Sequence, residues 1–246
     1  MIPPLGKTVR RIYRHAELYQ AGEGWQLCLD GKPLKTPARR LLVIPGRVLA
    51  EAAVLEWNAQ SERVDPLSMP VNRLANTALD RVAPSRAEVA ATAAAYGAAD
   101  LLCHRAGPED RALADLQASL WDPWLDWAAA EYGARLTPCA GIMPGRQPDP
   151  ALAALRHAVA AHDSFALTAL HEFTTLTGSL ILALALSRDA LTPAQAHELA
   201  VLDEMRQMDI WGRDMEVLRR LDARRQELMD AAAFLKMHRA QPVQAP

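Results

Sequence analysis

The period of the hydrophobic pattern changes once along the chain, and this change most constrains the fold. Apolar and polar residues alternate over short stretches up to residue 45, between the turn signals Gly22-Glu23-Gly24 and Asp30-Gly31. Alternation is typical of half-buried strands, and Asp-Gly between two such runs indicates a β-hairpin. The N-terminal part is therefore expected to form a small, mainly antiparallel sheet.

Helical spacing replaces this alternation after Pro45. Val48, Leu49, Ala52 and Leu55 recur on one helix face, which predicts a helix of about four turns packed on the sheet through Trp57. Beyond Pro84 nearly every stretch is alanine-rich and helix-forming. We therefore expect an α+β protein, with a β-rich N-terminal domain at residues 1–83 and an all-α C-terminal domain at residues 84–246.

Charge and hydropathy exclude two classes of partner. The 27 Lys and Arg against 29 Asp and Glu give a net charge of -2, so the basic field of a general nucleic-acid binder is missing. The longest uncharged run, residues 173–187, is shorter than the about 20 residues that cross a bilayer as a helix. We expect a buried core helix there. No targeting peptide is visible at the start of the chain.

Prolines, glycines and caps predict where the helices of the C-terminal part break. A stripe of Leu113, Leu116, Leu120, Trp124 and Trp127 indicates one helix, and Pro123 inside it predicts a kink or a break near Trp121-Asp122. Residues 137–150 are rich in Pro and Gly and predict a loop. The sequence Thr192-Pro193-Ala194-Gln195 predicts a helix start with a capping box, and this helix should reach at least Trp211.

No set of side chains indicates catalysis. Glycine patterns for phosphate binding and a serine nucleophile elbow are missing, and the three cysteines match neither a disulfide framework nor a zinc knuckle. The alternative is a metal-dependent hydrolase that uses His157, His162 and the His171-Glu172 region. Its spacing is poor, because two histidines on one helix face stand four residues apart and these stand five apart.

One row of residues differs from an ordinary solvated helix face. At 100° per residue, Asp203, Gln207, Trp211 and Asp214 fall within an arc of about 80°. Val201, Met205 and Met208 lie on the other side and predict a core stripe. A tryptophan among polar groups is typical of an interface anchor. The alternative is that the final helix covers Trp211.

Short strings spread over residues 30–212 resemble one family. They are Asp30 to Pro37, Glu56 to Gln60, Met69-Pro70, Asn76 to Asp80, Trp121 to Trp127, Tyr132-Gly133, Leu202-Asp203-Glu204, Gln207 and Trp211-Gly212. Each string is weak alone, but the whole set in this order is specific. On these residues the chain is similar to the assembly chaperones of the F-type ATP synthase, which bind the alpha subunit of the catalytic head before it meets the beta subunit.

The resemblance implies binding rather than catalysis. It implies a small β domain followed by a helical domain, and a chain that covers apolar surface of unassembled alpha subunit until beta takes its place. It also implies that an acidic residue of the family's Leu-acid-acid pattern is functional, and the matching positions here are Asp203 and Glu204. We therefore expect a chain that is monomeric when free, with no cofactor, metal, nucleic acid or membrane insertion. Eukaryotic members of this family carry a mitochondrial presequence, and no transit-type segment is visible here, so the resemblance favours a bacterial cytoplasm over a mitochondrial matrix. The candidate partner-binding residues are Asp203, Glu204, Gln207, Trp211 and Asp214.

Overall fold

The computed structural model describes residues 8–141 and 145–240, and the chain divides into two compact units. Unit 1 comprises Met1–Arg86, Ser164–Ala169 and Ala233–Pro246. Unit 2 comprises Ala87–Asp163 and Leu170–Ala232. The N-terminal segment of unit 1 ends three residues after the boundary expected from sequence, and two later segments belong to the same unit.

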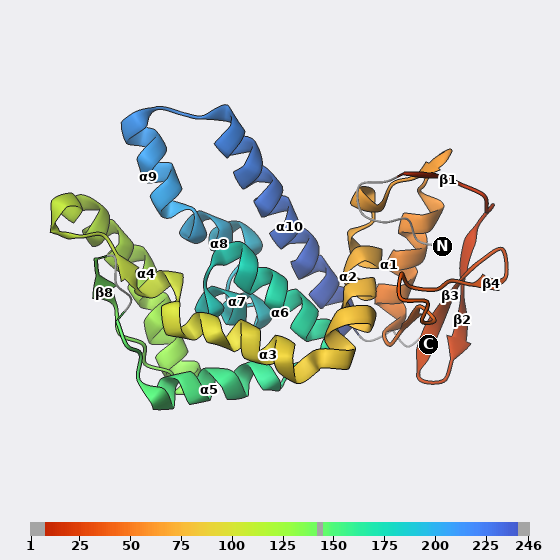
Figure 1. Cartoon of the computed structure of the whole chain (residues 1–246), viewed down its shortest axis with the longest axis horizontal. Coiled ribbons are helices and arrows are strands. Elements are labelled where there is room, and N and C mark those ends of the chain that lie inside the picture. The colour runs from red at the N-terminus through yellow and green to blue at the C-terminus, as the bar shows by residue number, and fades with distance from the viewer. Residues whose placement is uncertain (1–7, 142–144, 241–246) are drawn as a thin grey trace, which may run out of the picture. The chain divides into compact units, whose positions relative to one another are not determined.

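The first part of unit 1 contains short antiparallel sheets and one helix packed on them (Figure 1). Strand β3 (Gly24–Leu29) pairs with β2 (Ala16–Ala21), β4 (Lys32–Pro33) and β5 (Val43–Ile44), while β1 (Val9–Arg10) pairs with β6 (Arg63–Val64). Helix α1 (Arg47–Asn58) packs against β2 and β3. The α+β fold class and the helix predicted after Pro45 are confirmed.

The predicted Asp30-Gly31 hairpin is present between β3 and β4. Asp30 has φ 47° and Gly31 has φ 75°, and these two positive angles suit the turn type whose twist matches that of paired strands. The Asp30 carboxylate accepts hydrogen bonds from the backbone N–H groups of Arg14 and His15, at 3.0 and 3.1 Å. These bonds hold the turn against the residues that directly precede β2.

Trp57 joins α1 to its neighbours, as the sequence predicts for a structural tryptophan. Its side chain is 2% exposed, its Nε1 donates to Asn72 Oδ1 at 2.9 Å, and its ring meets Tyr13 edge-on at 5.5 Å. Glu56, one residue earlier, accepts bonds from the N–H groups of Val71 and Asn72 at 2.8 and 2.9 Å. A carboxylate there satisfies orphan donors at the start of helix α2 (Pro70–Thr77).

The chain from Pro70 to Ala95 is helical in successive pieces. Helix α2 is followed by a π-helical turn at Ala78–Val82, a 3-10 turn at Ala83–Ser85 and helix α3 (Arg86–Ala95). Only the stretch before Pro70, with a 3-10 turn at Pro66–Ser68, has the irregular character expected for residues 64–70. The division between the two units thus falls within a helical run.

The described part of unit 2 consists of helices and their connections, with one exception. The exception is a parallel pair of two-residue strands, β7 (His104–Arg105) and β8 (Cys139–Ala140), which interrupts the all-α pattern expected from sequence. Helix α6 gives its first residues to unit 1, and α10 gives its last. The remaining helices are α4 (Arg111–Tyr132), α5 (Asp149–Ala160), α6 (Ser164–Thr177), α7 (Leu180–Ser187), α8 (Pro193–Ala200), α9 (Leu202–Trp211) and α10 (Met215–Arg239), with 3-10 turns at Tyr96–Ala99, Leu101–Cys103 and Pro108–Asp110.

The core of unit 2 is built around α7, whose eight residues are all buried. This confirms the buried helix predicted within residues 173–187, although Gly178 (φ 69°) and the cap Ser179 separate it from α6. The fully buried Asp100 carboxylate accepts bonds from Leu102 and Ile181 N–H at 3.0 and 3.1 Å. Among the described residues, no helix is both long and apolar enough to span a bilayer.

Helix α4 corrects two expectations. It runs unbroken through Pro123, so the predicted break is wrong. Pro123 and Ser119, whose carbonyl loses its partner, are both exposed, so water can satisfy that oxygen. The buried side of α4 is also not the predicted leucine stripe, because Leu116 and Leu120 are exposed. It is formed instead by Gln117, Trp121, Leu125 and Ala128.

Candidate partner-binding face

The segment that carries the candidate residues is two helices rather than one. Thr192 and Gln195 form the predicted capping box at the start of α8. That helix ends at Ala200, and Val201 (φ -107°, ψ 14°) leaves the helical conformation before α9 begins at Leu202. At the other end Gly212, with φ 95°, terminates α9. The residues on α9 therefore share a face only from Leu202 to Trp211.

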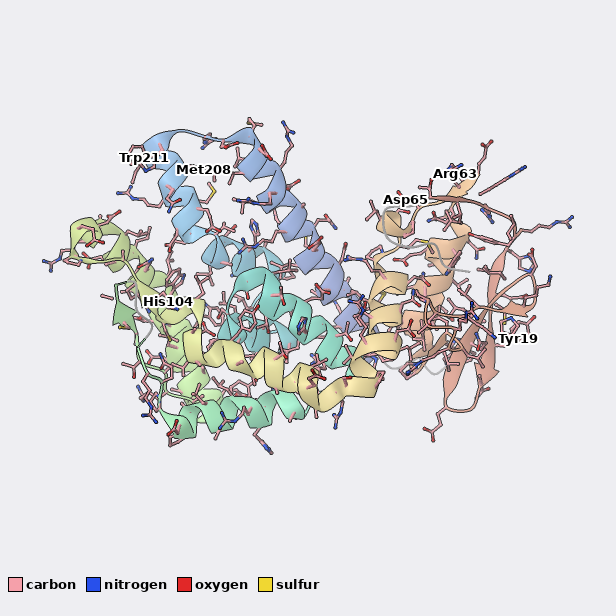
Figure 2. The ribbon with its side chains drawn as sticks, in the orientation of Figure 1. Tyr19, Arg63, Asp65, His104, Met208 and Trp211 are labelled. Carbon is pink, nitrogen blue, oxygen red and sulfur yellow. The ribbon has the colours of Figure 1, made fainter. Side chains whose placement is uncertain are left out.

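The apolar side of α9 packs on α10, as the predicted core stripe requires. Val201, Met208 and Leu221 form a small buried cluster, against which Met205, Val217 and Leu218 pack. Figure 2 shows Met208 on the side of α9 that faces α10, and Trp211 at the far end of the helix. This cluster fixes which side of α9 remains available to a partner.

Trp211 lies outside that cluster. It is 85% exposed, so the final helix does not cover it and this alternative is wrong. Ile210 before it and Met215 after it are 53% and 62% exposed. We call Ile210, Trp211 and Met215 the apolar tip. The row predicted from the sequence did not include Ile210 and Met215, because both lie outside the arc of about 80° on the helical wheel that contains Trp211.

Asp203 points into unit 2 rather than to solvent alone. Gln117 Nε2 on α4 donates to Asp203 Oδ1 at 2.8 Å, and Gln117 Oε1 accepts from Ala106 N–H at 2.7 Å. Burial raises the pKa of the Asp203 carboxyl above its usual range; the Gln117 bond opposes the shift, and the nearby Glu204 charge adds to it. Asp203 is therefore half-buried and links α9 to α4 through a hydrogen bond.

Glu204 also braces α9, in this case against α10. Its Oε1 lies 3.4 Å from Nη1 of Arg224, and Arg224 Nε donates to the carbonyl of Leu176 at 2.5 Å. Both side chains are partly buried. An ion pair in this setting is screened less than one on an open surface. The acidic pair thus has internal partners on both sides.

Asp214 lies away from the predicted row. Since α9 ends at Trp211, Asp214 sits in the connection to α10, and its Oδ1 accepts from Glu216 N–H at 2.8 Å. A carboxylate at this position caps a helix N-terminus. Gln207 and Trp211 are the two predicted residues that are exposed on α9 itself.

The histidines of the alternative hypothesis do not form a metal site. Among the residues described, no group of three or more His, Cys, Asp and Glu side chains is close enough to hold an ion. His162 Nδ1 lies 3.0 Å from the carbonyl of Ala158, and its Nε2 lies 3.3 Å from Ser187 Oγ. Both ring nitrogens of His162 are thus within hydrogen-bonding distance of groups at the end of α5 and on α7.

Comparison with known proteins gives one consistent result. The family described as ATP12 chaperone protein matches residues 10–129. The crystal structure of Atp12 from Paracoccus denitrificans is 42% identical, with a TM-score of 0.89 over 94% of this chain and 98% of that one. A variant of the same protein with one aspartate replaced by lysine aligns equally well, at 41% identity and TM-score 0.89.

A third structure comes from another bacterium. The Atu1473 protein of Agrobacterium tumefaciens, described as a candidate chaperone, is 42% identical with a TM-score of 0.88. The match covers 94% of this chain and 86% of that one. Identity at this level over nearly the whole length of both chains shows common descent as well as a common fold. The chain therefore belongs to the ATP12 chaperone family.

Proposed function

We propose that this protein is an assembly chaperone of the F-type ATP synthase that binds the unassembled alpha subunit, prevents its aggregation and hands it over to the beta subunit. Its membership of a chaperone family supports this function, and so do the strings on which it resembles the assembly chaperones. It acts by binding and is not an enzyme. We further propose that it works in the bacterial cytoplasm, is monomeric when free and needs no cofactor.

The observation that carries the proposal is the exposed apolar tip. The Trp211 indole is 85% exposed, and contact of this apolar ring with water does not stabilise the protein. Tryptophan is, however, among the commonest anchors of protein interfaces. Ile210 and Met215 extend the apolar surface around it. Gln207, one turn earlier on α9, adds a polar group at the rim. This combination suits an apolar surface of the alpha subunit that the beta subunit later covers.

The five candidate residues have different parts in this proposal. Trp211 and Gln207 directly contact the alpha subunit, which we call the client. Asp203 and Glu204 hold α9 in place through Gln117 and Arg224 and offer the remaining edge of their carboxylates to the client. Asp214 fixes the start of α10 and so the position of Met215.

The test separates binding from folding. Purified alpha subunit is diluted from denaturant with the chaperone, and aggregation is followed by light scattering. Trp211→Ala should melt like the parent, because substitutions of exposed side chains change stability by under about 0.5 kcal/mol. Loss of a central anchor costs about 2 kcal/mol or more, so the concentration needed for protection should rise at least about tenfold.

Two controls complete the experiment. Met229→Ala removes another exposed apolar side chain, on α10 outside the apolar tip, and should protect like the parent. Addition of purified beta subunit should release alpha from the complex. Equal protection by Trp211→Ala and the parent would remove the apolar tip from the binding site, and absence of any alpha complex would overturn the function.

A further inference from the structure

A hollow on unit 1 has no role in the function proposed above. It has a volume of about 670 Å³, which lies within the about 300–1,000 Å³ typical of ligand sites. It borders the β3–β4 hairpin and the turn that follows, and we call it the hairpin trough. Ile12 at its border is 91% exposed. Its apolar and aromatic lining consists of Ile12, Tyr13, Leu29, Pro33, Leu34 and Pro37.

The hairpin trough is positively charged. Lys32, Lys35 and Arg39 line it, all three are exposed, and none forms an ion pair with a described residue. The carboxylate in the lining, Asp30, is engaged by the backbone N–H groups of Arg14 and His15, which lower its pKa. Asp30 is therefore ionised, and the lining carries three cations and one carboxylate, a net positive charge that suits an acidic ligand.

Arg39 is the last residue of a three-residue hairpin loop between Thr36 and Arg40, and this loop accounts for its backbone conformation. Its φ is 65°, a region that side chains other than glycine rarely adopt. The Arg39 N–H donates to the carbonyl of Thr36 at 2.8 Å, and Asp80 accepts bonds from Thr36 Oγ1 and Ala38 N–H at 2.6 and 2.9 Å, so the turn is held on both sides. Glycine would suit this position better. From this loop the Arg39 side chain lines the hairpin trough.

We propose that the hairpin trough binds an extended segment of a protein partner in which apolar and acidic residues alternate. Successive side chains of an extended segment point to opposite sides, at about 3.3 Å per residue. One set can fill the apolar floor. The other set then meets the long Lys and Arg side chains at the border, which give charge complementarity.

Other occupants suit the hairpin trough less well. A small inorganic anion would leave the apolar lining uncovered, and a planar bilayer surface cannot fill a hollow. A second copy docked through the same face would set Lys32, Lys35 and Arg39 against their own equivalents, because a two-fold interface is self-complementary. An acidic and apolar peptide satisfies both the lining and the charge.

The experiment uses the full chain and a dye-labelled peptide of about eight residues, roughly 26 Å when extended, in which Leu and Glu alternate. Two comparison peptides replace Glu by Lys or Leu by Ser. Fluorescence anisotropy should show that the Leu–Glu peptide binds and that both comparison peptides bind at least tenfold more weakly. Raised salt should weaken binding of the Leu–Glu peptide.

Three variants locate the site. Lys32→Glu combined with Lys35→Glu should weaken binding of the Leu–Glu peptide at least tenfold, and Arg39→Gly several-fold. Arg39→Gly also controls for folding, because relief of the positive φ should leave its melting temperature unchanged or higher. Arg220→Gln removes the same charge from an exposed position on α10 in unit 2 and should bind like the parent.

The contrary outcomes are equally distinct. Equal binding by the parent and the lysine double variant would overturn the proposal, as would equal binding of the Leu–Glu and Ser–Glu peptides. Concentration-dependent dimerisation that excludes the peptide would assign the hairpin trough to a second copy, and binding only to anionic vesicles would assign it to a lipid surface. Alpha subunit is not part of this assay, so its result does not depend on the proposed chaperone function.

Discussion

Gln117 Nε2 donates a hydrogen bond to Asp203 Oδ1 at 2.8 Å and so ties α4 to α9 across 86 residues of sequence. Gln117 is buried, and its other amide atom accepts from Ala106 N–H. Its polar side chain is therefore satisfied only while Asp203 is in place. An acidic residue that the sequence places on a partner-binding row thus also holds that row to the body of unit 2.

The first prediction concerns the cost of reversing the Asp203 charge. Asp203→Lys should lower the free energy of unfolding by about 1–3 kcal/mol, because it leaves the buried Gln117 amide without its acceptor. Asp209→Lys makes the same charge change at an exposed position on α9 and should cost under about 0.5 kcal/mol. Urea unfolding of both variants checks this, and equal midpoints would show that the Gln117 bond does not stabilise α9.

The same pair of variants tests whether Asp203 touches the client. Protection of alpha subunit should be measured at a temperature where both variants are fully folded. If Asp203→Lys still loses protection there and Asp209→Lys does not, the charge acts at the interface. If Asp203→Lys protects the alpha subunit fully at that temperature, Asp203 only holds α9 in place and does not contact the client.

The second prediction is a pH dependence. Because the pKa of Asp203 is raised in the folded chain by burial, its ionised form opposes folding. This penalty is fully present above the folded pKa. It is lost as the pH falls from there toward the unfolded value of about 3.9. Asp203→Asn keeps an acceptor oxygen for Gln117 and removes the ionisation, so it should be at least as stable as the parent at neutral pH.

Thermal melting of the parent and Asp203→Asn between neutral and acidic pH checks this sign. The advantage of the Asn variant should shrink as the pH falls through the folded pKa of Asp203. An advantage that grows on acidification would mean that the carboxylate is stabilised in the folded chain, in contradiction to the shift that its burial produces.

The contacts of Asp203 mark where prediction from sequence ends. The hydrophobic period predicts correctly that the residues of α4 and α9 are helical, because each segment has apolar residues at helical spacing, but it does not separate α9 from α8. It assigns the wrong side of α4 to the core, since Gln117 is polar and its partner is 86 residues away. A buried hydrogen bond between distant residues leaves no periodic signal.

Helix ends limit the candidate site in the same way. A helical wheel assumes one straight helix, whereas Val201 and Gly212 interrupt this segment. Asp214 therefore leaves the row and becomes a cap of α10. The exposure of Trp211 was open as well, because spacing cannot say whether a neighbouring helix covers a side chain. By contrast, the Asp30-Gly31 turn and the Thr192 capping box are local, and the sequence predicts both.

The third prediction concerns Trp57 in unit 1. Trp57→Arg should lower the free energy of unfolding by several kcal/mol, about 3–5, because it buries a charge without a partner and empties the space beside Tyr13 and Asn72. Leu55→Arg on the same helix is the control, since Leu55 is exposed. Denaturant melts compare the two, and a Trp57→Arg protein that unfolds like Leu55→Arg would contradict this structural role.

The fourth prediction tests the proposed division into domains at residues 1–83 and 84–246. If the two parts unfold separately, calorimetry of the parent should show two transitions, and Trp57→Arg should lower only one of them. Leu155→Ala removes a fully buried side chain of α5 in unit 2 and should cost about 2–5 kcal/mol. It should therefore lower only the other transition. Helices α6 and α10 each supply residues to both units, so they are the elements that could couple the two parts. A single transition that both substitutions lower would show such coupling and would replace the boundary at 83 with one cooperative domain.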